Sequence, residues 1–256
     1  MARDNTHALS FGLAVDDYER GRPSYPAAAV DWMLAQSSPN EPPSAADLVI
    51  VDVGAGTGKF TASFAERGLN VTAVEPDSAM RARFSARFPH VEALEGTGES
   101  LPLPDTSVDL VTFAQAWHWV DVEAASAEIA RVLKPGGTLG LIWNIRDDSV
   151  EWVRQLGEIM GASAAEEYET LTPPVGASLE RVAHADFFWD NPLSREQLLA
   201  MVTSRSYIIA MSEDKRRALL QQLEELLDEH PQLAGHDTYV MPYVTSVTLA
   251  RALPVS

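Results

Sequence analysis

The sequence has no cysteine, few basic residues and no long apolar run, and each shortage excludes a class of protein. Without cysteine, the 256-residue chain forms no disulfide bond and binds no metal through thiolates. Its six histidines are scattered without the close spacing of a histidine metal site, so we predict no metal. No segment approaches the roughly 20 apolar residues that a membrane helix needs. The N-terminus lacks the apolar region of a secretion signal. We therefore expect a cytoplasmic protein without membrane contact.

The shortage of basic residues also restricts the binding partners. The chain has 19 Lys and Arg against 37 Asp and Glu, which gives a formal net charge of −18, and no long run of basic residues occurs. Nucleic-acid backbones are bound by basic patches and are repelled by an acidic surface. Nucleic acid is therefore disfavoured, and we expect a small-molecule substrate. The sequence does not predict the oligomeric state.

The most informative feature that is present is a glycine loop. The apolar segment Val49–Val53 contains Asp52 and runs directly into Gly54-Ala55-Gly56-Thr57-Gly58. An amphipathic segment follows, so the pattern predicts a strand, a loop and a helix. This arrangement presents backbone N–H groups to a small ligand at the helix start. A second apolar segment, Val71–Val74, ends at Glu75, whose carboxylate suits the hydroxyls of a ribose. We infer a cofactor that contains a nucleoside.

The spacing of the glycines distinguishes between cofactors. A dinucleotide loop needs a third small residue where this chain has Lys59, which would prevent close packing of the helix on the strand. A phosphate-binding loop would need glycine at Val53 and Ser or Thr at Phe60. Both phosphate-binding motifs fail, which favours S-adenosylmethionine. A nicotinamide-dependent oxidoreductase stays open as the alternative, because the first two glycines fit it.

Five segments in order resemble the class I S-adenosylmethionine-dependent methyltransferases. They are the glycine loop with its strand, the second strand end, the loop after the third strand, the fourth strand with its active-site loop, and the turn into the fifth strand: Val51–Gly58, Val74–Pro76, Glu95–Pro102, Val108–Trp119 and Arg131–Gly137. The opening Tyr18-x-x-x-Arg22-Pro23-x-Tyr25-Pro26 and the Gln115-Ala116-x-His118-Trp119 loop are similar to a subgroup that includes trans-aconitate and ubiquinone-menaquinone methyltransferase-like proteins.

The alternation of strands and helices predicts an α/β fold with a doubly wound parallel sheet. The resemblance implies seven strands in a Rossmann-like sheet of order 3-2-1-4-5-7-6, with the last strand antiparallel. We expect one domain over residues 1–256, with the cofactor-binding core at about 45–145 and a fifth strand at Thr138–Trp143. Further strands are expected near 184–190 and 238–250. Helical cap elements are expected at about 1–34, 146–182 and 192–236.

The resemblance also implies a set of cofactor contacts. Glu75 binds the ribose, and Thr97 stands where many relatives have an aspartate that accepts from the adenine amino group. The backbone at Ala114 and Gln115 meets the methionine ammonium, and Arg22 with Tyr18 reaches the carboxylate. The full predicted set is Tyr18, Arg22, Asp52, Gly54, Ala55, Gly56, Gly58, Glu75, Pro76, Met80, Thr97, Gly98, Glu99, Ala114 and Gln115.

His118 is the candidate catalytic residue, because a histidine in the loop after the fourth strand could act as a general base that faces the transferred methyl group. The alternative for His118 is a packing role between Trp117 and Trp119. The predicted reaction is in-line transfer of a methyl group to an O, N or C atom of a small acceptor, and carboxylates are among the candidate acceptors. The product formed from the cofactor is S-adenosylhomocysteine. A non-catalytic S-adenosylmethionine-binding regulator stays open as a further alternative.

Overall fold

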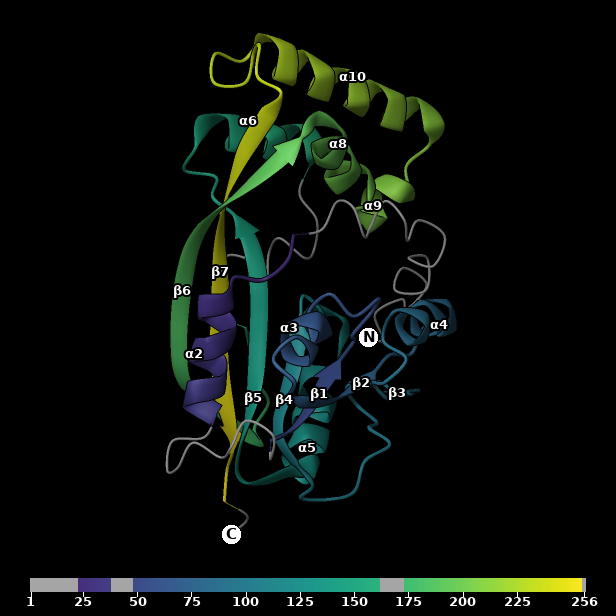
Figure 1. Cartoon of the computed structure of the whole chain (residues 1–256), viewed down its shortest axis with the longest axis vertical. Helices are drawn as coiled ribbons and strands as arrows, with labels where there is room; N and C mark the ends of the chain where they lie inside the picture. The colour runs from purple at the N-terminus through teal and green to yellow at the C-terminus, as the bar shows by residue number, and fades with distance from the viewer. Residues whose placement is uncertain (1–22, 38–47, 162–172, 255–256) are drawn as a thin grey trace.

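The computed structural model describes residues 23–37, 48–161 and 173–254, and these form one seven-stranded sheet with helices on both faces (Figure 1). The strand order is β3-β2-β1-β4-β5-β7-β6, which confirms the prediction. β1 to β5 are parallel, and β7 runs antiparallel to both β5 and β6. The strands are β1 Val49–Val53, β2 Asn70–Val74, β3 Ala93–Leu94, β4 Val108–Ala114, β5 Leu133–Arg146, β6 Leu179–Ser194 and β7 Thr238–Ala252.

The helices divide between the two faces of the sheet and one end of it. α2 and α3 contribute to the core on one face, and α5 contributes to the core on the other. α6, α8 and α10 share a separate apolar core with the upper parts of β6 and β7. The helices are α2 Ala27–Ser37, α3 Thr61–Ala65, α4 Ser78–Arg87, the 3₁₀ turn η3 Trp117–Trp119, α5 Val122–Val132, α6 Glu151–Met160, α8 Arg195–Thr203, α9 Ser206–Ile209 and α10 Glu213–Glu229.

The separate core exists because β6 and β7 extend beyond the rest of the sheet. β5 ends where Arg146 pairs with Tyr243, whereas β6 and β7 continue to pair as far as Ser194 and Thr238. Figure 1 shows this two-stranded ribbon passing between α6, α8 and α10. We call these three helices, with α9, the helical cap. The ribbon therefore holds the cap beyond the end of β5, which itself extends four residues past its pairing with the last residue of β4.

Some predicted strand limits were wrong, because pairing and not local pattern sets them. β5 begins at Leu133 and not at Thr138, since Leu133 already pairs with Val108 before a bulge. β6 is much longer than the segment expected near 184–190, because β7 pairs along its whole length.

Two findings concern the described residues alone. None of their helices combines the length and the hydropathy that crossing a bilayer requires. Within the same residues, no group of three His, Asp or Glu side chains lies close enough together to hold a metal ion.

Candidate functional site

The glycine loop between β1 and α3 is held against the end of β2. The N–H groups of Gly54 and Ala55 both donate to the carbonyl of Val74, at 2.8 and 3.2 Å. Gly54, Gly56 and Gly58 have φ of +67°, +58° and +87°, a region that residues with a side chain rarely adopt. The loop conformation therefore requires glycine and is fixed by hydrogen bonds within the chain.

The three glycines differ in what surrounds them. A methyl group built on Gly54 would lie 2.8 Å from Cβ of Ala116, and one on Gly58 would lie 2.5 Å from Cε2 of Phe88. A methyl group on Gly56 would meet no atom within 4 Å. The absence of a side chain at Gly58 thus lets the glycine loop pack closely on Phe88. The same absence at Gly54 lets the loop after β4 come close to the glycine loop. Gly56 instead borders open space, where a ligand can approach the backbone.

Glu75 lies beside this open space. Its Oε2 accepts a hydrogen bond from N of Gly56 at 2.8 Å, and its Oε1 accepts from N of Asp77 at 2.9 Å. The residue is 7% exposed, and burial raises the pKa of Glu75 although both hydrogen bonds act in the opposite direction. Each carboxylate oxygen has a second lone pair. The carboxylate therefore fixes the loop and can still accept from a ligand hydroxyl.

Asp52 is buried beneath the loop and bonded to two threonines. Thr61 donates to its Oδ2 at 2.6 Å, and Thr112 donates to its Oδ1 at 3.0 Å. Asp52 is 1% exposed, and this burial raises its pKa to about 6, since desolvation outweighs the two hydrogen bonds. The carboxyl group thus links β1, α3 and β4. In this arrangement both of its oxygens are engaged by the protein itself.

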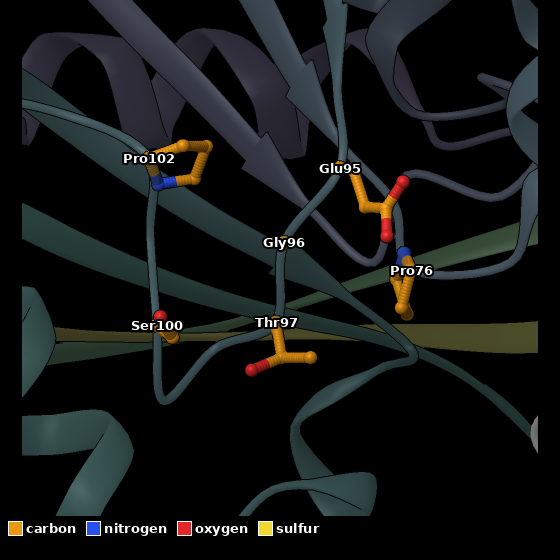
Figure 2. Close-up of a pocket in the computed structure, with 6 residues that line it drawn as sticks. All are labelled: Pro76, Glu95, Gly96, Thr97, Ser100 and Pro102. Carbon is orange, nitrogen blue, oxygen red and sulfur yellow. The ribbon is translucent and has the colours of Figure 1, made fainter.

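A pocket of about 330 Å³ opens next to the end of β2 (Figure 2). Figure 2 shows Glu95 and Pro76 on one side, Ser100 and Pro102 on the other, and Thr97 between them. Thr97 and Ser100 close the turn at its floor with two backbone hydrogen bonds, at 3.2 and 3.1 Å. The pocket therefore offers a proline ring together with hydroxyl and carboxylate oxygens, a combination that suits a planar heterocycle.

The pocket brings in residues that the sequence did not single out. Pro76 and Thr97 were predicted, but Glu95, Ser100 and Pro102 were not. Glu95 also pairs with Arg81, whose guanidinium donates to the Glu75 carbonyl at 2.7 Å. Glu95, Ser100 and Pro102 lie within one of the five segments that resemble the family, so the sequence indicated this region of the chain but not these side chains. Their side chains meet only because Ser100 folds back onto Thr97.

The chain leaves β4 in a strained conformation. Gln115 has φ of +57°, a value that costs a residue with a side chain roughly 1–2 kcal/mol. Its N–H donates to the carbonyl of Ile142 at 2.9 Å, and its Nε2 donates to the carbonyl of Asn144 at 3.1 Å. Strain of this kind is typical of functional sites. Here it turns the backbone after Ala114 across the carboxyl end of the sheet.

His118 lies in the short 3₁₀ turn that follows. Trp117 is fully buried and donates from Nε1 to the carbonyl of Pro174 at 2.8 Å. The rings of His118 and Trp119 lie 4.6 Å apart and are tilted by 44°. The half-buried imidazole is therefore held beside a tryptophan ring, close in sequence to Gln115.

The remaining predicted site residues have diverse surroundings. Met80 is buried in the first turn of α4. Gly98 packs tightly, since a methyl group there would lie 2.8 Å from Val120. The side chain of Glu99 accepts from N of Asp121 at 2.8 Å, just before α5. Tyr18 and Arg22 lie outside the described residues.

Comparison with known proteins gives the site its context. A family model described as a methyltransferase domain matches residues 51–141. An uncharacterised methyltransferase of Mycobacterium tuberculosis is 47% identical over 93% of this chain and 93% of its own length. A methyltransferase-like protein of Schizosaccharomyces pombe is 33% identical over 92% and 93% of the two chains.

The chain belongs to the class I S-adenosylmethionine-dependent methyltransferases. A solved structure of a candidate type II methyltransferase from Anaeromyxobacter dehalogenans has the same fold, with a TM-score of 0.64 at 22% identity over 91% of this chain and 99% of that one. Membership of this family leaves the nicotinamide-dependent oxidoreductase without support.

The residues present in this methyltransferase fit the cofactor of its family. The open space at Gly56 admits a ligand close to the backbone, and Glu75 places a carboxylate beside it. The pocket at Thr97 adjoins this position through Pro76, the residue after Glu75. Among the described residues, neither place has a group of positive charges of the kind that binds phosphate. The features therefore suit an adenosyl group without a phosphate.

Proposed function

We propose that this methyltransferase transfers the methyl group of S-adenosylmethionine to a small-molecule acceptor and releases S-adenosylhomocysteine. The observation that carries the proposal is the Glu75 carboxylate, bonded to Gly56 beside the open space at the ends of β1 and β2. When bound, S-adenosylmethionine supplies an electrophilic methyl carbon, which an O, N or C nucleophile attacks in line while the bonding electron pair returns to sulfur.

In this proposal the described residues mainly bind and orient the cofactor. Glu75 accepts from the ribose hydroxyls, and Gly54, Ala55, Gly56 and Gly58 form the wall along the cofactor. Pro76, Met80, Thr97, Gly98 and Glu99 surround the adenine, and the backbone of Ala114 and Gln115 receives the ammonium. Asp52 supports the loop from below and adds negative charge near the cationic ligand. Tyr18 and Arg22 are proposed to reach its carboxylate.

A small acceptor is supported by how the basic residues are used. Within the described residues, many of the cations are already neutralised by acidic neighbours: Arg67, Arg81, Arg131, Lys134, Arg154, Arg195 and Arg217 form salt bridges. Nucleic acid would meet an acidic surface. An acceptor with a carboxylate would need arginines near the cap, and Arg146 at the end of β5 and Arg205, buried in the cap, stand in this region. The cap elements are proposed to cover and select this acceptor.

His118 is proposed as the general base that removes a proton from the acceptor during transfer. General bases contribute roughly 10²–10⁴-fold to rates. We therefore expect His118→Gln to lower the rate of S-adenosylhomocysteine formation by a factor in this range while the affinity for S-adenosylmethionine is unchanged. Equal rates for the variant and the wild type would show that the transfer needs no base here.

The proposed function is tested by titration calorimetry with S-adenosylmethionine and by product formation. We expect saturable binding to the folded protein, and S-adenosylhomocysteine release with at least one member of an acceptor panel rich in carboxylates. No binding at millimolar ligand would refute the cofactor site. Binding without turnover across the panel would instead support the non-catalytic regulator.

A further inference from the structure

A series of side-chain hydrogen bonds leads from the proposed cofactor site to the base of the helical cap. Nε2 of Gln115 donates to the carbonyl of Asn144 at 3.1 Å. Oγ1 of Thr245 donates to Oδ1 of Asn144 at 2.6 Å, and Nε1 of Trp189 donates to Oγ1 of Thr245 at 2.8 Å. Asn144 also donates from Nδ2 to the carbonyl of Ser24 at 3.1 Å. The series thus joins the loop after β4 to β5, β7 and β6.

The polar pair in this series replaces an apolar one. Asn144 and Thr245 are directly opposed residues of β5 and β7, and both are almost completely buried. Two positions earlier on β5, the same face carries Ile142 opposite Val247, and both belong to an apolar core. Apolar residues therefore suffice for packing between these strands. The polar pair occurs where β5 reaches the carboxyl end of the sheet, next to Gln115.

The series ends at the cap. The ring of Trp189 stacks on that of Tyr243 with centroids 5.3 Å apart, and the Tyr243 hydroxyl lies 3.3 Å from the sulfur of Met201 in α8. Tyr243 and Met201 belong to the apolar core of the cap. A continuous set of contacts, buried between Asn144 and Thr245 and partly buried at Gln115 and Trp189, therefore connects the cap core with the strained residue Gln115. Buried polar networks of this kind fix one conformation when every member is bonded.

We propose that Asn144 and Thr245 are positioning residues for methyl transfer. They hold the end of β5, which in turn keeps Gln115 at its positive φ and its backbone aligned with the amino-acid end of the cofactor. Through Trp189 they link this alignment to the cap that covers the acceptor. The inference rests on the proposed function, because it assumes that S-adenosylmethionine binds along the glycine loop with its methionine part at Gln115.

The test compares two ligands and two threonines of β7. S-adenosylmethionine contains the amino-acid end, whereas 5′-methylthioadenosine lacks it. Thr245→Val removes the hydroxyl that bonds Asn144 and Trp189, and Thr245→Ser keeps it. The matched control is Thr248→Val, because Thr248 is equally buried but faces the other side of the sheet and bonds His184 at 3.0 Å. Titration calorimetry is performed on each full-length variant below its unfolding temperature.

We expect Thr245→Val to weaken binding of S-adenosylmethionine about fivefold or more, a typical coupling between linked sites, with little change for 5′-methylthioadenosine. Thr245→Ser and Thr248→Val should keep the wild-type ratio of the two affinities. Equal weakening for both ligands, or the same loss in Thr248→Val, would overturn the positioning role. Wild-type protein that binds neither ligand would refute the proposed function itself.

A further variant tests the link to the cap. Trp189→Phe removes the indole N–H while an aromatic ring still faces Tyr243, and we expect it to shift the ratio of affinities in the same direction as Thr245→Val. An unchanged ratio in Trp189→Phe would overturn the link to the cap.

Discussion

The two glycines Gly56 and Gly58 lie two residues apart in one loop, yet replacing each with alanine should have different consequences. Both have positive φ, so an alanine side chain costs roughly 1–2 kcal/mol at either position. At Gly58 the new methyl group would also lie 2.5 Å from Phe88 and 2.8 Å from the fully buried Phe84. Overpacking of this kind adds roughly 1–3 kcal/mol. The free energy of unfolding should therefore fall by about 2–5 kcal/mol in Gly58→Ala.

At Gly56 the methyl group meets no atom of the described residues within 4 Å, so the stability cost should be limited to the backbone strain. The methyl group would instead occupy the space where the cofactor approaches the loop. If the clash with the ligand costs roughly 1–3 kcal/mol, as overpacking does in a protein core, the affinity for S-adenosylmethionine falls between about 5- and 150-fold. Gly56→Ala should thus be mainly a binding defect, in a protein that loses only the roughly 1–2 kcal/mol of backbone strain.

Urea unfolding and titration calorimetry on both variants separate the two effects. Gly58→Ala should lose more stability than Gly56→Ala. Gly56→Ala should weaken binding of S-adenosylmethionine under conditions where the variant is fully folded. Unchanged affinity in Gly56→Ala would show that the cofactor does not approach this part of the backbone. Wild-type stability in Gly58→Ala would show that the phenylalanine pair moves aside.

Three further predictions concern side chains around the loop. Because the pKa of buried Asp52 is raised from 3.8 to about 6, the folded state binds its proton more tightly than the unfolded state. The free energy of unfolding should therefore fall by at most about 3 kcal/mol between about pH 4 and about pH 6, and should stay at the lower value above pH 6. Urea titrations across this pH range should show a smaller fall for Asp52→Asn. An equal fall in Asp52→Asn and in the wild type would show that Asp52 is not the group responsible. The buried hydroxyl of Thr57 has no hydrogen-bond partner among the described residues. Thr57→Val should therefore raise the free energy of unfolding by about 1 kcal/mol. A loss of stability in this variant would mean that the hydroxyl is hydrogen-bonded in solution. Glu75→Gln should weaken binding of both S-adenosylmethionine and adenosine about tenfold or more in calorimetry, and wild-type adenosine affinity would argue against ribose recognition.

Local pattern in the sequence was enough to locate most of the strands, though not their limits, and to locate the glycine loop and the acidic residues of the proposed cofactor site. The glycines could be predicted because positive φ is a property of single residues. Asp77 and Asp121 stand directly before helices, and both side chains accept from backbone N–H groups in the first turn, since caps depend on neighbouring residues. The strand order came from the resemblance of the motifs, because periodicity alone does not order strands in a sheet.

The tertiary structure decided which side chains meet. Asp52 binds Thr61 and Thr112 because β4 pairs in parallel with β1, which places Thr112 opposite Asp52, and because the glycine loop brings the start of α3 back to this strand. Thr245 reaches Asn144 only through the antiparallel register of β5 and β7. Sequence by itself thus determined the conformations that depend on adjacent residues. The partners of the buried polar groups, and with them their pKa values and their proposed roles, arose when packing excluded water from segments far apart in the chain.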